Sequence, residues 1–252
     1  MRIALISDIH GNMVSLKNVL ADIERQQVDD IVFLGDLATL GPQPREVVTT
    51  LRNLNCHCVM GNHDTFLFDP AAMQAYSQDT WIGEAVDWCK AQLAPEDLSF
   101  IHSFKPFLEI TLDPHHEQAS KLFCFHGSPR SNVDQIVATT SIRRLKQMLM
   151  GYEAAIFAGG HTHVQMIRQH KGTLIMNAGS VGQPFAQSTF KHAPSVLPWA
   201  EYAIIGWHEG ALNVDLRRVP INLDAVKAAA MDSDLPAKHT WINNWQVNGK
   251  GK

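Results

Sequence analysis

Acidic, amide and imidazole side chains follow five short apolar segments of this chain. One histidine after an apolar segment is usually structural, but five such endings in one sequence make a chance arrangement improbable. Carboxylate, amide and imidazole donors without thiolate favour manganese, iron, zinc or nickel. The eight candidate side chains exceed the four ligands of one tetrahedral zinc and suit two metal ions. These side chains are Asp8, His10, Asp36, Asn62, His63, His126, His161 and His163.

The chemistry that such a group could perform is hydrolysis of a phosphoester. Two divalent ions about 3.5–4 Å apart polarise a phosphoryl oxygen and lower the pKa of a water molecule between them. A histidine beside the metals, but not bound to them, could protonate the leaving oxygen or stabilise charge near it.

The apolar segments must be strands for these side chains to meet. Short apolar runs are typical of strands buried on both faces. Apolar residues spaced three and four apart predict a helix over residues 13–26, so that residues 3–36 form a right-handed βαβ unit. The carboxyl ends of parallel strands meet at one edge of a sheet, which is where open α/β sheets bind ligands. The expected strands are residues 3–6, 31–34, 58–60, 122–125 and 154–158.

The rest of the pattern predicts a single domain over residues 1–232. Residues 65–105 interrupt the strand rhythm and predict a small helical insertion beside the site. Later strand-like segments have short turns between them and suit antiparallel pairing. Residues 233–252 form a polar C-terminal tail in which Trp241 and Trp245 are expected to cover a sheet edge, with a partner surface as the alternative. The other expected strands are 107–112, 164–169, 173–177, 202–207 and 211–219, and the other expected helices are 44–53, 139–150 and 222–231.

Composition limits the classes of partner. The chain has 252 residues, 45% of them hydrophobic, and a formal net charge of −4. No run of lysine and arginine exceeds two residues, which argues against polymeric nucleic acid or an anionic membrane and leaves a small phosphorylated substrate. The absence of a secretory apolar segment and of a transmembrane run predicts a cytoplasmic protein. The sequence does not indicate its oligomeric state.

Cys56 and Cys58 flank His57 in a strand-like run. Two small buried strand residues are favoured over a metal-binding clip at this position.

The ordered motifs resemble a known family. Asp8-x-His10, Gly35-Asp36, Gly61-Asn62-His63-Asp64, His126 and Gly160-His161-x-His163 are similar to the five motifs of the calcineurin-like metallophosphoesterase superfamily. His126-Gly127-Ser128-Pro129 and Asn177-Ala178-Gly179-Ser180 further resemble its small bacterial and archaeal phosphodiesterase branch. This resemblance implies an α/β fold with four layers, α/β/β/α, in which two sheets pack face to face between helices.

The resemblance also implies roles for the residues. The first metal would be held by Asp8, His10, Asp36 and His163. The second metal would be held by Asp36, Asn62, His126 and His161, with Asp36 bridging the two. His63 would be the catalytic acid or anion stabiliser. Two divalent ions are expected, with manganese first and iron, zinc or nickel as alternatives.

The departures from the family pattern concern the substrate. Protein phosphatases and symmetric dinucleoside tetraphosphatases of the family carry an arginine motif after the Gly-Asp pair, and here Gly35-Asp36 continues Leu-Ala-Thr-Leu-Gly. Arg45 and Arg130 could bind phosphate instead, or be surface residues. Asn12 could contact the substrate or cap the first helix. Asp64 could orient His63 or close the turn.

The leading hypothesis is therefore a metal-dependent phosphoesterase acting on a small phosphodiester or nucleotide. A dinucleoside polyphosphate hydrolase and a phosphomonoesterase or protein phosphatase of the same fold are alternatives. A different class is a non-catalytic scaffold on that fold, which could lose a ligand without effect; here every motif is intact, which favours catalysis. A Rossmann dinucleotide enzyme is excluded because no Gly-x-Gly-x-x-Gly follows the first strand.

Overall fold

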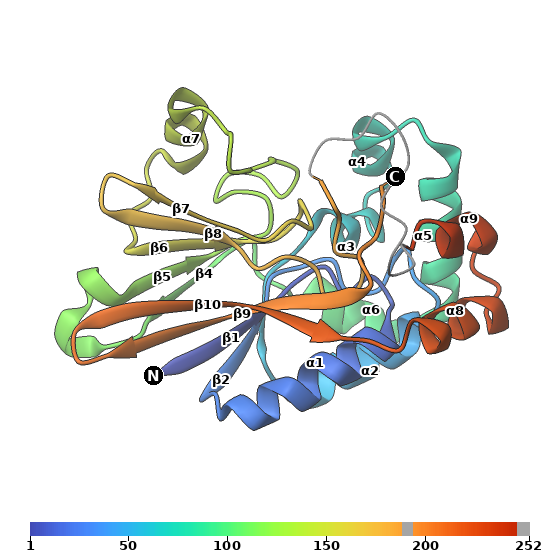
Figure 1. Ribbon diagram of the computed structural model, residues 1–252. Coiled ribbons are helices and arrows are strands. Elements are labelled where there is room, and N and C mark those ends of the chain that lie inside the picture. Colours follow the sequence, from blue (N-terminus) through green and yellow to red (C-terminus); the bar gives the residue numbers. More distant parts are fainter. Residues whose placement is uncertain (188–193, 246–252) are drawn as a thin grey trace.

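Two five-stranded mixed sheets form the centre of the computed structural model, which describes residues 1–187 and 194–245 (Figure 1). The first sheet has the order β10-β9-β1-β2-β3 and the second the order β4-β5-β6-β8-β7. The strands of the first sheet are β1 (Arg2–Ile6), β2 (Asp30–Phe33), β3 (His57–Cys58), β9 (Trp199–His208) and β10 (Ala211–Pro220). Those of the second are β4 (Leu108–Thr111), β5 (Lys121–Cys124), β6 (Ile156–Gly159), β7 (Met166–His170) and β8 (Thr173–Asn177).

Helices surround these sheets, and most lie where the sequence pattern predicts them. β1 is followed by α1 (Met13–Gln26) and β2 by α2 (Pro44–Leu54), while α3 (Asn62–Phe66) follows β3. The insertion contains α4 (Pro70–Tyr76), α5 (Thr80–Gln92) and α6 (Pro95–His102). The later helices are α7 (Ile142–Leu149), α8 (Leu223–Asp232) and α9 (Lys238–Asn243). No helix in the described part of the chain is long and apolar enough to cross a membrane.

The alternation within β1 shows how the layers are held together. Ile3 and Leu5 pack between the two sheets, against residues of β5 and β6 such as Leu122 and Ile156. Ala4 and Ile6, on the opposite face, pack toward the apolar sides of α1 and α2. Both faces of the strand are fully buried, which is why its sequence is a continuous apolar run.

A separate apolar cluster covers the outer face of the second sheet. Phe123 and Phe157 of that sheet pack against Leu145 and Met148 of α7 and against Ile136 in the preceding loop. Figure 1 shows α7 on one side of the paired sheets and α1 and α2 on the other. The expected α/β/β/α arrangement is confirmed.

Parallel pairing brings the strand ends together. β1, β2 and β3 are parallel neighbours in one sheet, and β5, β6 and β8 are parallel neighbours in the other. β3 ends at Cys58, two residues earlier than expected. Val59 still donates to the carbonyl of Phe33, but the Met60 amide turns away to the carbonyl of Lys105. The chain therefore leaves the first sheet before Gly61, because the Met60 amide donates to the carbonyl of Lys105 at the end of the insertion and not to β2.

The expectation that Trp241 and Trp245 cover a sheet edge is wrong. Both indoles are almost fully buried, and they pack with Val226 and Ala230 of α8 and with Val196. Trp81 and Trp88 of the insertion pack against the same cluster, and α9 lies beside α5 in Figure 1. The tail contains a helix because these apolar residues bury against other helices.

Candidate metal centre

Five of the predicted ligands have left-handed backbone conformations. Their φ angles lie between 44° and 67°: Asp8, His10, Asp36, His161 and His163. A non-glycine residue in this region costs about 1–3 kcal/mol and persists only where the surrounding structure enforces it. Such strain is concentrated at functional sites, and here it lies in the turns that follow β1, β2 and β6.

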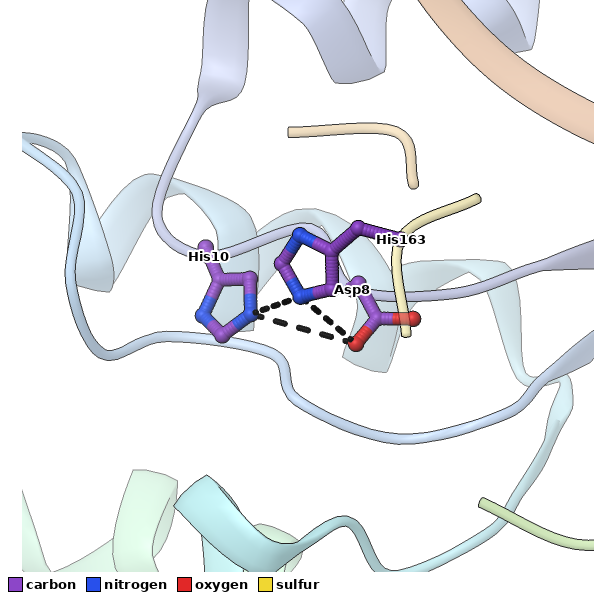
Figure 2. Close-up of side chains that lie close together, drawn as sticks. All are labelled: Asp8, His10 and His163. Carbon is purple, nitrogen blue, oxygen red and sulfur yellow. Dashed lines mark hydrogen bonds and ion pairs between the residues drawn. The ribbon is translucent and has the colours of Figure 1, made fainter. Parts of the chain in front are cut away.

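The first group contains Asp8, His10 and His163 (Figure 2). Asp8 and His10 follow β1, and His163 follows β6. The His163 Nε2 lies 3.2 Å from the Asp8 Oδ1 and 3.1 Å from the His10 Nε2. The three donor atoms point toward one another in Figure 2, as ligands of a single ion would.

The second group contains Asp36, His126 and His161. The His126 Nε2 lies 3.2 Å from the Asp36 Oδ2 and 3.0 Å from the Asn62 Oδ1. The same Asp36 oxygen lies 3.7 Å from the His10 Nε2 of the first group. Asp36 therefore faces both groups, and Asn62 faces the second.

Backbone carbonyls orient three of the histidine rings. The Nδ1 atoms of His10, His126 and His163 lie 3.0, 2.8 and 2.7 Å from the carbonyl oxygens of Thr39, Leu34 and Gln183. A ring that donates its Nδ1–H to a carbonyl directs the Nε2 lone pair to the opposite side. Each ring thus presents a metal-binding nitrogen to the centre, and the partner carbonyls are far away in sequence.

A loop of small residues holds the end of β1 in place. The Ser180 hydroxyl donates to the carbonyl of Asp8 at 2.7 Å, and the Gly182 amide donates to the same oxygen at 2.9 Å. The Val181 amide donates to the carbonyl of Ser7. This loop follows β8, whose parallel pairing with β6 places it at the same edge as His161. Its role is to support the left-handed turn at Asp8.

The donor set fits divalent ions. Burial lowers the pKa of His10 to about 4 and that of His161 to about 4, aided by neighbouring histidines, so both rings are neutral at pH 7. Neutral imidazole is the metal-binding form. The buried Nε2 of His161 has no hydrogen-bond partner among the described residues. A buried nitrogen without a partner is destabilising unless a bound group satisfies it. A metal ion could do so here, since Asp36 and His126 supply further metal-binding atoms beside His161.

Charge at the centre is balanced by His126. Burial alone would lower its pKa, but Asp36 and then Asp8 raise the pKa of His126 to about 9. Burial alone would raise the pKa of Asp8, whereas His163 and His126 lower it to about 2. Despite its burial, the pKa of Asp36 is held well below its usual range by His126 first and then by His63 and His10. A cation entering this site would replace the His126 proton.

His63 lies beside both groups but belongs to neither. Its ring centroid is 5.2 Å from that of His10, and its backbone amide donates to the Asp36 Oδ1 at 2.8 Å. Burial lowers the pKa of His63 to about 3. The ring lines an open cavity with the candidate ligands. This is the position expected of a residue that contacts a substrate and not a metal.

Asp64 holds the loop that carries Asp36. Its two carboxylate oxygens accept hydrogen bonds from the backbone amides of Asp36, Leu37 and Gly61, at 2.8 to 2.9 Å. Burial and the neighbouring Asp36 raise the pKa of Asp64 to about 6. Of the two roles considered from the sequence, closing the turn is the one that these contacts support, because no bond from Asp64 to the His63 ring is present among the described residues.

The three weaker substrate-binding candidates lie elsewhere. The Asn12 side chain accepts from the Ser15 amide and so caps α1, while its amide group donates to Gly182. Arg45 is exposed at the start of α2, and Arg130 donates to the carbonyl of Met150. None of the three lines the cavity above the metal groups.

Sequence reasoning missed the side chains that do line this cavity. They include Tyr76, Trp81, Gln183 and Thr240. Phe185 also lies there, with its ring stacked on His163 at 4.2 Å between centroids. They come from the insertion, the β8 loop and the C-terminal helix, and no spacing in the sequence connects these segments.

Comparison with known proteins agrees with the geometry. Residues 1–194 match the model of the calcineurin-like phosphoesterase superfamily domain, and the chain therefore belongs to this superfamily. An uncharacterized protein of Methanocaldococcus jannaschii is 29% identical over 198 residues, 72% of this chain and 76% of that protein. The crystal structure of a metallophosphoesterase from Sphaerobacter thermophilus aligns with a TM-score of 0.73 and 27% identity, covering 97% of this chain and 98% of that one.

A relative with a named substrate aligns over less of its length. A symmetrical bis(5'-nucleosyl)-tetraphosphatase of Hamiltonella defensa is 28% identical over 159 residues, 61% of this chain and 54% of that protein. The expected resemblance to the phosphoesterase superfamily is thus confirmed, and the names of the family and of these relatives support a hydrolase role.

Proposed function

Starting from membership in the calcineurin-like phosphoesterase superfamily, we propose that this protein is a dinuclear phosphodiesterase of small substrates. The observation that carries the proposal is the position of Asp36, whose Oδ2 lies 3.2 Å from the His126 Nε2 and 3.7 Å from the His10 Nε2. One carboxylate between two groups of buried ligands is the arrangement that two adjacent ions require. Manganese is the first choice of metal because the donors are oxygen and imidazole.

The contacts support two ligand sets. Asp8, His10, Asp36 and His163 would hold one ion, and Asp36, Asn62, His126 and His161 the other. Two bound divalent ions would supply charge neutralisation at a phosphoryl group and an activated water. The protein contributes rigid placement, since carbonyls fix the histidine rings and the Ser180 loop fixes Asp8.

His63 would act on the substrate directly. Its ring lies at the cavity floor between the candidate ligands and the open space. From there a ring N–H can donate to the leaving oxygen or to a phosphoryl oxygen, which stabilises the charge that develops as the ester bond breaks. The buried Nδ1 of His63 has no hydrogen-bond partner among the described residues.

A dinucleoside polyphosphate hydrolase is the second candidate, since a relative of that name aligns with more than half of this chain. The arginine motif that the tetraphosphatase branch carries after the Gly-Asp pair is absent here, because Asp36 is followed by Leu37 and Ala38. The intact ligand set argues against a non-catalytic scaffold. The cytoplasmic location expected from the sequence stays a prediction.

Hydrolysis of bis(p-nitrophenyl) phosphate with manganese, iron, zinc or nickel tests the proposal. We expect His63→Ala to keep both metals, measured by elemental analysis, and to lose about 10²- to 10⁴-fold in rate. Asn62→Ala should weaken binding of the second metal. His57→Ala is the matched control, because that imidazole is 65% exposed on β3 and belongs to neither ligand group.

Three outcomes would overturn parts of the proposal. Absence of hydrolysis with all four metals, for phosphodiesters and phosphomonoesters alike, would refute phosphoesterase activity. If the protein binds only one metal ion per chain at saturating metal concentration, the dinuclear centre is refuted. Full activity of His63→Ala would remove that residue from the mechanism.

A further inference from the structure

A cavity of about 620 Å³ opens directly above the candidate metal centre. His10, Asp36 and His161 form part of its floor, next to His63. Its volume falls in the range of pockets that bind small molecules. The cavity is larger than one phosphoryl group requires, so a further part of the substrate should occupy it.

The walls of this cavity are largely aromatic and apolar. Tyr76 comes from α4, Trp81 and Ile82 from α5, and Trp241 from α9. These segments are held together near the cavity, because the Trp81 indole donates to the carbonyl of Pro236 at 3.0 Å, just before α9. The insertion and the C-terminal tail therefore build one wall from distant parts of the sequence.

The charged groups of this lining are anionic or lie on the floor. No lysine or arginine lines the cavity among the residues that the structure describes. Apart from Asp36 and the floor histidines, the charged side chain of the lining is Asp79, whose carboxylate accepts from the Trp81 amide at 3.1 Å. The other polar groups are neutral, such as Gln135, Thr240 and Asn244.

We infer that this cavity binds an uncharged aromatic group of the substrate, such as an aryl or nucleoside group esterified to the reacting phosphate. The inference rests on the proposed phosphoesterase function. Apolar walls gain free energy when they bury a planar ring. Among the residues that the structure describes, a second phosphate in the same space would lie near Asp79 and without a lysine or arginine to pair with, and burying an unpaired charge is strongly unfavourable. The described lining therefore favours an aryl or nucleoside phosphoester over a polyphosphate.

Tyr76 is placed to contact that group. Its ring centroid lies 6.3 Å from the His63 ring and 6.2 Å from the His161 ring, and it packs on Phe66 at 5.4 Å. The side chain is nevertheless 39% exposed. Tyr76 thus stands between the metal groups and the outer wall with part of its ring accessible, which suits stacking against a ligand ring.

Calorimetric titration of the manganese-loaded full chain with phosphonates tests this without catalysis. Phenylphosphonate and methylphosphonate carry the same metal-binding group and differ only in the organic part. We expect phenylphosphonate to bind about ten- to hundredfold more tightly, as burial of a phenyl ring predicts. 4-Phosphonobenzoate, which adds a carboxylate to the ring, should bind several-fold more weakly than phenylphosphonate.

Variants then locate the ring. Tyr76→Ala should remove most of the preference for phenylphosphonate while leaving the affinity for methylphosphonate nearly unchanged. Ile82→Asp should reduce the same preference by placing a carboxylate in the wall. Tyr152→Ala is the matched control, because that ring packs on Phe107 and Phe123 at the second sheet and does not line the cavity. Thermal unfolding would confirm that each variant is folded at the titration temperature.

The outcomes separate this inference from the proposed function. Equal affinities of the wild-type protein for phenylphosphonate and methylphosphonate would overturn it, even if the protein hydrolyses phosphoesters. Tighter binding of 4-phosphonobenzoate than of phenylphosphonate would overturn it as well. A clear preference for phenylphosphonate that Tyr76→Ala abolishes would support the inference, even if hydrolysis were absent and the proposed function failed.

Discussion

Replacement of Asp64 tests how the metal-bearing loops are held together. Its carboxylate accepts hydrogen bonds from three buried backbone amides, those of Asp36, Leu37 and Gly61. In Asp64→Asn one oxygen can still accept from two of these amides, while the new amide group faces the third. One buried N–H without a partner costs about 1–3 kcal/mol. For a chain of this size, that lowers the melting temperature by about 2–12 °C.

A matched control is available at Asp69. Its carboxylate accepts from two amides at the exposed start of α4, those of Ala71 and Ala72. Asparagine is as good an N-cap as aspartate, and water can satisfy any group left over, so Asp69→Asn should leave stability nearly unchanged. Urea unfolding of both variants in EDTA measures the difference without a contribution from metal. If the two variants unfold within about 0.5 kcal/mol of each other, the role assigned to Asp64 is wrong.

Two further predictions concern packing and pH. A Cβ on Gly61 would overlap the Asp36 carboxylate, whereas one on Gly206 meets its nearest atom at 3.7 Å. Gly61→Ala should therefore lose bound metal, and the control Gly206→Ala should keep it. Elemental analysis of both purified variants measures this. Burial would raise the pKa of Asp22, but hydrogen bonds, first that from Tyr202, lower it. The ionised Asp22 carboxylate therefore stabilises the fold in full above the unfolded pKa of about 3.9, and this contribution is lost as pH falls through the folded pKa. The difference in unfolding free energy between wild type and Asp22→Asn should accordingly be smaller at pH 3 than at pH 7, and an unchanged difference would contradict this.

Most of the strands could be predicted because they follow from local patterns. β1 has no polar residue between Ile3 and Ile6, and it is buried on both faces as such a run requires. β3 was less predictable. The amide of Met60, its last expected residue, donates to the carbonyl of Lys105 at the end of the insertion, and a long-range hydrogen bond leaves no mark in the strand's own sequence.

The C-terminal tail shows the same limit. Trp241 and Trp245 were expected at a sheet edge, and they are buried among helices. Two tryptophans four residues apart indicate only that one face of a helix is apolar. Which surface buries that face depends on where α8 and the insertion lie, and that position is set by tertiary packing.

The metal-competent side chains were determined by the sequence itself. Asp8, Asp36 and His126 come two or three residues after β1, β2 and β5, so formation of these strands brings them to one edge of the paired sheets. Tertiary structure decided what surrounds them. The carbonyls that orient the rings, the hold of Asp64 on the Asp36 loop and the aromatic wall with Tyr76 all join segments distant in the chain. Such contacts depend on the relative positions of whole elements, and these positions arise only when the sheets, the insertion and the tail pack together.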